Sequence, residues 1–452
     1  MEGKIKIDYF LFFSVLASSM IGAQFLGVSL SKISLIPLEL YLIICFWGKK
    51  THLNKIKKVT LCWFGLIFVS SLFNVTFCEI LEDEYFSVLL FNMIQVVLFH
   101  VPLLFLFDSV DSAFIKFKKC VLIVAKINCI WCIIQFIAWA AFSFDFNNFV
   151  FIHLLHGALG DREWTAWTYE TNLLALRPTG LNRDPAFLAL LLVFGFALTK
   201  SIFWKCLFFG GTVVAMSRVG IVSIVFFILF EKYQQGVFKV NVNRAALGVL
   251  PVILFSVCAI WLYNNTDYAN RQMNIAYSRF ENMIDRSSSG AGSDRHLFYI
   301  PASILTSIEL PLANQILGIG PRTGGAAFHL TESYKSFFTL NDHMMKKKVW
   351  AIECDPAELL LGCGFIGFVL YYFMMFSFAR KYRHDLQDCF LFVMIPVFGV
   401  MYDISMHPLI TLLLIVATQP VCRTLDNESS KNRETIAFRR QIPEEMTIGT
   451  NI

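Results

Sequence analysis

The chain has 452 residues, of which 56% are hydrophobic and only 16% are charged, and its formal net charge is +5. Soluble domains carry about 25% charged residues, so this composition excludes a soluble enzyme, a disordered protein and a nucleic-acid binder. A membrane span needs about 20 mostly apolar residues, and roughly twelve spans would account for the apolar content. We therefore expect an all-α polytopic membrane protein whose positive charge reflects membrane topology.

Apolar runs predict the membrane helices along the chain. In order, they cover residues 9–28, 33–47, 59–78, 86–107, 121–142, 184–199, 201–216, 219–230, 246–263, 356–378, 387–402 and 407–422. The runs indicate a single transmembrane domain over residues 1–422, interrupted by long loops at about 143–183 and 264–355. The polar tail 423–452 is typical of a disordered segment.

The second long loop is too long to be structureless. After Pro301 and before Pro311, an amphipathic stretch predicts a helix. Because regular two-residue alternation of apolar and polar residues is absent, we expect no sheet.

Lysine and arginine are distributed unevenly between alternate connecting segments. The segments predicted to be cytoplasmic hold most of them, at 4–6, 49–58, 116–119, 200–205, 232–244, 380–383 and in the tail. The short loops on the other side hold only Lys32 and Arg218. Because positive residues stay inside, both termini are predicted to be cytoplasmic and both long loops to face outside.

The twelve cysteines do not indicate a disulfide scaffold, because most of them lie in apolar runs. Cys129 and Cys132 form a C-x-x-C pair, but it lies inside a predicted membrane helix and no second pair accompanies it. We interpret them as small buried hydrophobic residues and expect no metal site.

Arginines are the first candidate functional residues on the outer side. Arg177 and Arg183 precede a helix that Asp184 and Pro185 are suited to begin. Arg218 falls between two apolar runs, where a charge is costly unless it faces a cavity or a partner. A guanidinium group binds phosphate or carboxylate through two parallel hydrogen bonds, which suits an anionic lipid-linked substrate. Headgroup anchoring and local salt bridges are the alternative interpretation.

Four loose motifs in this order resemble the O-antigen ligase and polymerase superfamily. They are Arg177, Gly180, Asp184 and Pro185; Ser217, Arg218 and Gly220; Arg295, Pro311, Gly318 and Gly320; and the run from Glu358 to Phe368. The resemblance covers about residues 177–368, and the helix layout with a large late loop extends it to the rest of the chain.

The resemblance implies a membrane-embedded glycosyltransferase fold in the bacterial cytoplasmic membrane. Such enzymes join glycans outside that membrane, take their donor from undecaprenyl diphosphate, and use neither a nucleotide sugar nor a metal or other cofactor. By resemblance, Arg218 and Arg295 hold the diphosphate. Substrate binding is expected from Arg177, Arg183, His343, Gly318 and Gly320. Membrane lipids and a chain-length regulator are the other implied partners.

One departure from the family concerns the proton acceptor. Many ligases carry His-Asn before the final leucine-rich helix, where this chain has Glu353 and Cys354. Glu353 and Asp355 are therefore candidate catalytic bases, with Glu358 and His343 as alternatives. The competing interpretation is that the acids cap or complement the helix beginning near Pro356, and that His343 is an ordinary surface residue.

Three functions compete. The first is an O-antigen polymerase that transfers a growing lipid-linked glycan onto a new lipid-linked repeat unit. The second is a ligase that joins the glycan to lipid A core, which the missing His-Asn pair disfavours. The third is a polysaccharide flippase or other transporter. A transporter would more often show symmetric halves and polar helices at the bilayer midplane, whereas polar residues here gather in the two long outer loops.

Overall fold

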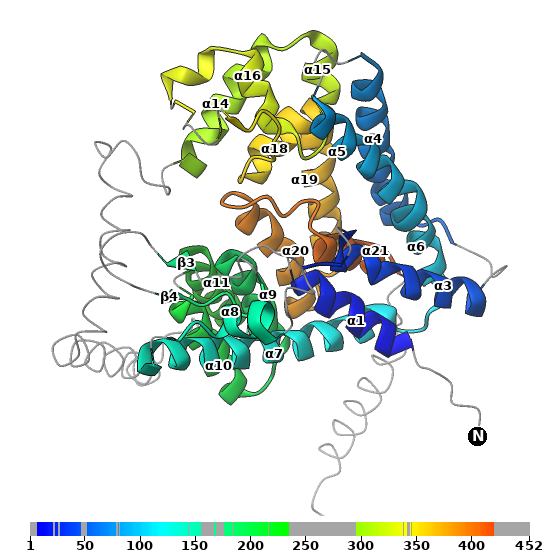
Figure 1. Cartoon of the computed structure of the whole chain (residues 1–452). Coiled ribbons are helices and arrows are strands. Elements are labelled where there is room, and N and C mark those ends of the chain that lie inside the picture. The colour runs from blue at the N-terminus through cyan, green and yellow to red at the C-terminus, as the bar shows by residue number, and fades with distance from the viewer. Residues whose placement is uncertain are drawn as a thin grey trace, which may run out of the picture. The chain divides into compact units, whose positions relative to one another are not determined.

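The computed structural model contains mostly helices, as predicted (Figure 1). It describes residues 7–20, 23–25, 28–46, 52–77, 80, 82–142, 144–154, 167–168, 176–182, 184–215, 217–234, 295–337, 339–340, 344 and 346–419. One compact unit ends at Thr418. The predicted helix 246–263 and the predicted tail 423–452 lie outside the described residues.

The described residues before 235 form helices and two short antiparallel strand pairs. They are α1 (Ile7–Ser19), β1 (Gln24–Phe25), β2 (Val28–Ser29), α2 (Leu30–Ile33), α3 (Leu35–Phe46), α4 (Lys55–Phe77), α5 (Asp83–Gln95), a π-helical turn (Val96–His100), α6 (Val101–Leu106), a 3₁₀ turn (Phe107–Ser109), α7 (Ala113–Phe142), α8 (Phe146–Asn148), a second π-helical turn (Phe149–Leu154), β3 (Trp167–Thr168), β4 (Leu176–Arg177), α9 (Pro185–Leu198), α10 (Ile202–Val214) and α11 (Arg218–Gln234).

The described residues after 294 form helices joined by 3₁₀ turns and loops. They are α14 (Arg295–Glu309), α15 (Leu312–Leu317), a 3₁₀ turn (Gly324–Ala326), α16 (Ala327–Leu330), a 3₁₀ turn (Ser333–Ser336), α18 (Asp355–Gly362), α19 (Gly364–Lys381), α20 (Leu386–Gly399) and α21 (Pro408–Ala417). The amphipathic stretch is helical as predicted, although α14 begins at Arg295 and so contains Pro301.

Three helical stretches among the described residues are long and apolar enough to cross a membrane: Lys55–Phe77, Asp83–Ser109 and Ala113–Trp139. Large apolar side chains on them are exposed, such as Leu72 on α4 and Ile130 on α7. Exposing such side chains to water costs about 25 cal/mol per Å², whereas lipid accepts them. These helices therefore indicate a membrane protein. The shorter apolar helices α1, α9, α10, α20 and α21 have 10–17 residues.

The structure differs from the sequence prediction in several details, and the predicted helix 356–378 is divided into α18 and α19. The predicted helix 9–28 ends at Ser19, and β1 and β2 pair antiparallel just after it, with Gln24 opposite Ser29. β3 and β4 form a second antiparallel pair inside the first long loop, whereas the expectation of no sheet concerned the second long loop, whose described residues contain no strand. Each pairing spans only two residues per strand, which is too short to leave an alternating pattern in the sequence.

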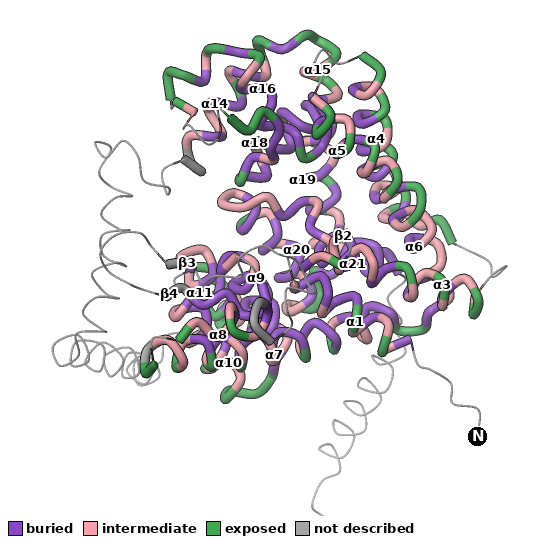
Figure 2. Tube along the Cα trace, viewed as in Figure 1, coloured by how far each residue is buried: buried purple, intermediate pink, exposed green. Residues whose placement is uncertain are grey.

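The buried residues form two main clusters. The larger one joins α1, α3, α4, α7, α9 and α19–α21. The smaller one belongs to the segment from α14 to α18, where Tyr299, Phe328 and Trp350 pack together. Figure 2 shows buried residues along α9 and α18, whereas α15 has none. The segment from α14 to α18 therefore has a hydrophobic core of its own, which can hold a site in place.

Candidate functional site

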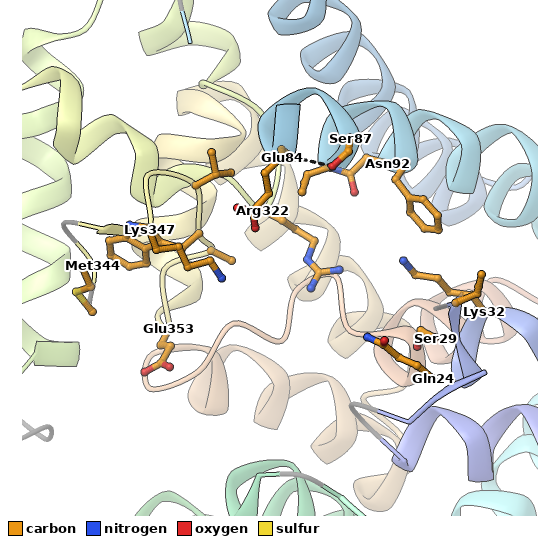
Figure 3. Close-up of a pocket in the computed structure, with 16 residues that line it drawn as sticks. Gln24, Ser29, Lys32, Glu84, Ser87, Asn92, Arg322, Met344, Lys347 and Glu353 are labelled. Carbon is orange, nitrogen blue, oxygen red and sulfur yellow. Dashed lines mark hydrogen bonds between the residues drawn. The ribbon is translucent and has the colours of Figure 1, made fainter. Parts of the chain in front are cut away.

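A polar cavity of about 780 Å³ lies where three separate parts of the chain meet. They are the β1–β2 hairpin with α2, one face of α5, and the segment between α15 and α18 (Figure 3). Small-molecule sites have volumes of about 300–1,000 Å³, so the cavity is large enough for a ligand. Its polar lining comprises the neutral Gln24, Ser29, Ser87 and Asn92, the carboxylates Glu84 and Glu353, and the cations Lys32, Arg322 and Lys347.

Lys32 enters the cavity from α2. Its Nζ lies 3.4 Å from the ring centre of Phe91 on α5, a cation–π contact that favours the charged amine. Burial and, to a lesser extent, the positive charge of Arg322 lower the pKa of Lys32 to about 8. The two cations are therefore close enough to repel each other, and Figure 3 shows both side chains pointing into the same space.

The loop that carries Arg322 is clamped by α4 and α5. Four side chains donate hydrogen bonds to backbone carbonyl oxygens of residues 317–321. The donors are Ser70 and Asn74 of α4, and Tyr85 and Asn92 of α5. Because buried carbonyl groups need partners, these hydrogen bonds fix the loop against two of the membrane-length stretches.

Gly318 and Gly320 allow the other side of this loop to approach α18 and α19. Their φ angles are +76° and +113°, and the N–H of Gly320 donates to the carbonyl oxygen of Gly362 at 2.9 Å. A Cβ on Gly318 would clash with the backbone of Gly362, and one on Gly320 with the side chain of Leu89. Neither glycine is among the cavity-lining residues. The structure therefore gives them a positioning role for the loop that ends in Arg322.

Arg322 has an unusual backbone conformation, with a φ of +64°. Residues other than glycine rarely adopt a positive φ, and such backbone strain is often found at functional sites. The side chain is exposed. Among the residues that the structure describes, no hydrogen bond or ion pair joins its guanidinium group to a partner. Its donors are therefore available to a ligand.

Glu353 reaches the cavity from the segment that follows Trp350. The Trp350 carbonyl oxygen accepts from the N–H of Gly325 at 3.0 Å, and a Cβ on Gly325 would clash with the Trp350 ring. This close contact fixes the start of the segment. The Glu353 side chain is exposed and lies across the cavity from Lys32 (Figure 3).

Glu358 fixes two of the loops that build the cavity. Its side chain is 2% exposed. It accepts hydrogen bonds from the N–H of Ile352 at 2.8 Å and from the N–H of Gly324 at 3.2 Å. Gly324 precedes Trp350 in the sequence and Ile352 follows it. Glu358 therefore fixes the backbone both before and after the cavity-lining residue Trp350.

Asp355 fixes the loop between α20 and α21, just as Glu358 fixes the cavity loops. It is fully buried and accepts from the N–H groups of Ile404 and Ser405 at 3.0 and 2.9 Å. Burial first, and then the charge of Asp403, raise the pKa of Asp355 well above its usual range. Burial also raises the pKa of Asp403, whereas the positive charge of Arg322 opposes that shift. Asp355 thus lies close to a second carboxyl group and is not among the residues that line the cavity.

The N-terminal cap predicted for α9 is found in the structure, whereas the cap of α18 differs from the prediction. Asp184 caps α9, as predicted, by accepting from the N–H of Ala186 at 2.7 Å. At α18 the cap position belongs to Cys354, which makes no capping hydrogen bond through its side chain. Asp355 instead occupies the first turn and binds another loop.

The predicted site residues are only partly brought together. Glu353 lines the cavity, and Asp355, Gly318 and Gly320 lie in the structure around it. Arg218 begins α11, is half-buried and does not line the cavity.

The remaining predictions fall wholly or partly outside the described residues. Arg295 begins α14 and Arg177 lies in β4, but their side chains are not described. Arg183 and His343 are outside the described residues altogether.

Sequence reasoning missed the three cations that line the cavity: Lys32, Arg322 and Lys347. A signal for Arg322 was present, because it follows directly on the Gly-Ile-Gly-Pro run that predicts close backbone approach. Lys32 had a signal of another kind, as one of the few positive residues in a short loop predicted to lie outside.

The comparisons with known proteins add no family assignment. The sequence significantly matches no known protein-family profile and no curated protein.

Proposed function

We propose that this protein is an O-antigen polymerase, a metal-independent glycosyltransferase of the bacterial cytoplasmic membrane. It would transfer a growing undecaprenyl-diphosphate-linked glycan onto a new lipid-linked repeat unit on the periplasmic side. The observation that carries this proposal is the cavity, in which an exposed carboxylate, Glu353, lies opposite the cations Lys32 and Arg322. Such an arrangement places a candidate proton acceptor in the same cavity as cations that can bind an anionic glycan substrate.

The origin of the cavity supports the proposed topology. Its lining comes from residues 24–32, 84–92 and 322–353, and the positive-inside rule assigns all three ranges to the outer side or to the helix ends nearest to it. Both termini would then be cytoplasmic. A site for lipid-linked substrates that are joined outside the cytoplasm would have to lie on this side.

Contacts between segments predicted to be cytoplasmic support the same topology. Lys57 forms a buried ion pair with Asp108, and Lys118 forms a partly buried one with Asp388. Each of these lysines is predicted to be cytoplasmic, and its acidic partner lies at a helix end that is also predicted to be cytoplasmic.

The proposed reaction requires a proton acceptor and charge stabilisation. An acceptor hydroxyl attacks the anomeric carbon of the donor, the bond from that carbon to the diphosphate oxygen breaks, and its electron pair leaves with the lipid diphosphate. Glu353 takes the hydroxyl proton. It suits this role better than Asp355, because Glu353 is exposed to the cavity whereas Asp355 is fully buried and bound to two backbone N–H groups.

The proposal is tested with purified full-length protein in lipid vesicles and its native lipid-linked repeat units. Wild-type protein should produce a ladder of polymer lengths. Glu353→Gln keeps the size of the side chain and should reduce elongation at least 100-fold, which is within the usual range for loss of a general base. Glu332→Gln is the matched control, because Glu332 is exposed and pairs only with the nearby Lys335 among the described residues.

A wild-type ladder from Glu353→Gln would assign this residue to structure alone. Absence of any polymer from the wild-type protein, together with transfer of glycan to lipid A core, would identify a ligase. Movement of intact lipid-linked units across the vesicle membrane without elongation would identify a flippase.

A further inference from the structure

Lys32 and Arg322 are two cations that approach each other inside one cavity. The positive charge of Arg322 acts on Lys32, and their side chains point into the same space in Figure 3. In the part of the chain that the structure describes, neither side chain forms a salt bridge with an acidic residue. Their mutual repulsion would fall if a ligand placed an oxyanion between them.

Both cations are presented by specific local structure. Lys32 follows the β1–β2 hairpin and lies over the ring of Phe91. Arg322 follows the clamped loop 317–321 and has its own backbone at a φ of +64°. Because each position requires an unusual local arrangement, the pair differs from two lysine or arginine side chains that meet by chance on a surface.

The charge balance of the cavity indicates the kind of anion. Three cations and two carboxylates line it, which leaves a net formal charge of plus one. This charge matches a single carboxylate, whereas a diphosphate carries at least two negative charges. The neutral lining groups Gln24, Ser29 and Asn92 offer hydrogen bonds of the kind that sugar hydroxyls and amides accept and donate.

We propose that Lys32 and Arg322 form a subsite for the carboxylate of an acidic sugar in the glycan substrate. This inference rests on the proposed function for the identity of the ligand as a glycan. It adds that the repeat unit contains a uronic-acid-type residue. Arg322 would bind the carboxylate through its planar fork, and Lys32 would add a point charge.

The test measures direct binding to full-length protein in detergent at pH 7. The probes are a disaccharide containing glucuronic acid and its methyl ester, which is neutral but otherwise the same. Wild-type protein should bind the acid about tenfold more tightly than the ester, in line with one charge-assisted hydrogen-bonding contact. Lys32→Ala and Arg322→Ala should each bring that preference close to one.

Two further variants guard against loss of folding. Arg322→Gly removes the guanidinium group but suits the positive φ at this position, so it should fold and still lose the preference. Lys335→Ala is the matched control, because Lys335 is an exposed cation of the same late segment that does not line the cavity. It should retain the preference.

Equal binding of the acid and the ester by wild-type protein would overturn the subsite. The subsite would also be overturned if Lys32→Ala, Arg322→Ala and Arg322→Gly all kept the full preference for the acid over the ester. Inorganic pyrophosphate provides the last arm: if it displaces the acid at concentrations below those at which the acid itself binds, the subsite belongs to the diphosphate instead.

Polymer synthesis separates this inference from the proposed function. If wild-type protein elongates glycans but does not distinguish the acid from the ester, the subsite fails while the polymerase stands. If it distinguishes them but never elongates native lipid-linked units, the proposed function fails while the subsite stands.

Discussion

At the scale of single residues, Lys32 is a cavity side chain whose charge can change near neutral pH. Burial, together with the positive charge of Arg322, lowers its pKa to about 8. The amine is charged below that pH and loses its charge as the pH rises through it. The charged side chains that line the same cavity are Arg322, Lys347, Glu84 and Glu353.

We therefore predict that binding of the glucuronate probe weakens severalfold between pH 7 and pH 9. Because a bound anion favours the charged amine, the midpoint should lie somewhat above 8 in the complex. The binding constant, measured by titration at each pH, checks this prediction. Lys32→Arg is the control, since a guanidinium group stays protonated over this range, and its binding should be nearly independent of pH. A wild-type curve as flat as that of the variant would contradict the role of Lys32.

At the scale of elements, α18 connects the parts of the site. Glu358 holds the backbone at Gly324 and Ile352, and Asp355 holds the loop that contains Ile404. The sequence predicts one continuous helix over 356–378, but the structure divides it into α18 and α19. The division falls at Gly364, where φ is +69° and where a Cβ would clash with the carbonyl group of Ile316. This break allows the loop before Arg322 to pack closely.

We predict that Gly364→Ala destabilises the protein by about 2–4 kcal/mol, because the left-handed backbone and the clash both carry a cost. Gly210→Ala in α10 is the matched control: nothing lies within 4 Å of a Cβ there, and alanine favours a helix by up to about 1 kcal/mol. Thermal unfolding of both variants in detergent checks the prediction. Equal melting temperatures would show that the junction tolerates a side chain.

At the scale of the whole molecule, the sequence predicts the helices better than it predicts the site. Apolar runs indicate where helices lie because burial and lipid contact both require such residues. The same runs cannot distinguish the end of α1 from the hairpin after it, since residues 24–29 are apolar enough for either. As a result, most of the hairpin that precedes Lys32 was predicted to belong to the helix 9–28.

The site also depends on contacts between residues far apart in the sequence. Asn92 binds the loop before Arg322 across 229 positions, and no local pattern predicts such a pairing. Glu353 could be found because it precedes a recognisable helix start. The burial of Asp355, only two residues later, could not, because both acids fit the first turn of a helix equally well.

The orientation of the whole chain is the last prediction. If the cavity faces the periplasm, a reporter inserted after Ser333 in the full-length protein must be translocated, whereas one inserted after Arg383 must stay in the cytoplasm. Ser333 lies in the late segment that builds the cavity, and Arg383 follows the positively charged end of α19. Alkaline phosphatase folds only where disulfides form, so it should be active after Ser333 and inactive after Arg383.

A green fluorescent protein inserted at the same two positions should give the reverse pattern and serves as the control for expression. The results at the two positions must be compared, because the cavity-lining segments contact one another and the lysine-rich segments also contact one another. The two groups of segments are therefore expected on opposite sides of the membrane. Phosphatase activity after Arg383 but not after Ser333 would place the cavity in the cytoplasm. Glu353, Lys32 and Arg322 would then be unable to act on glycans joined outside the membrane, and the polymerase proposal would fail with the topology.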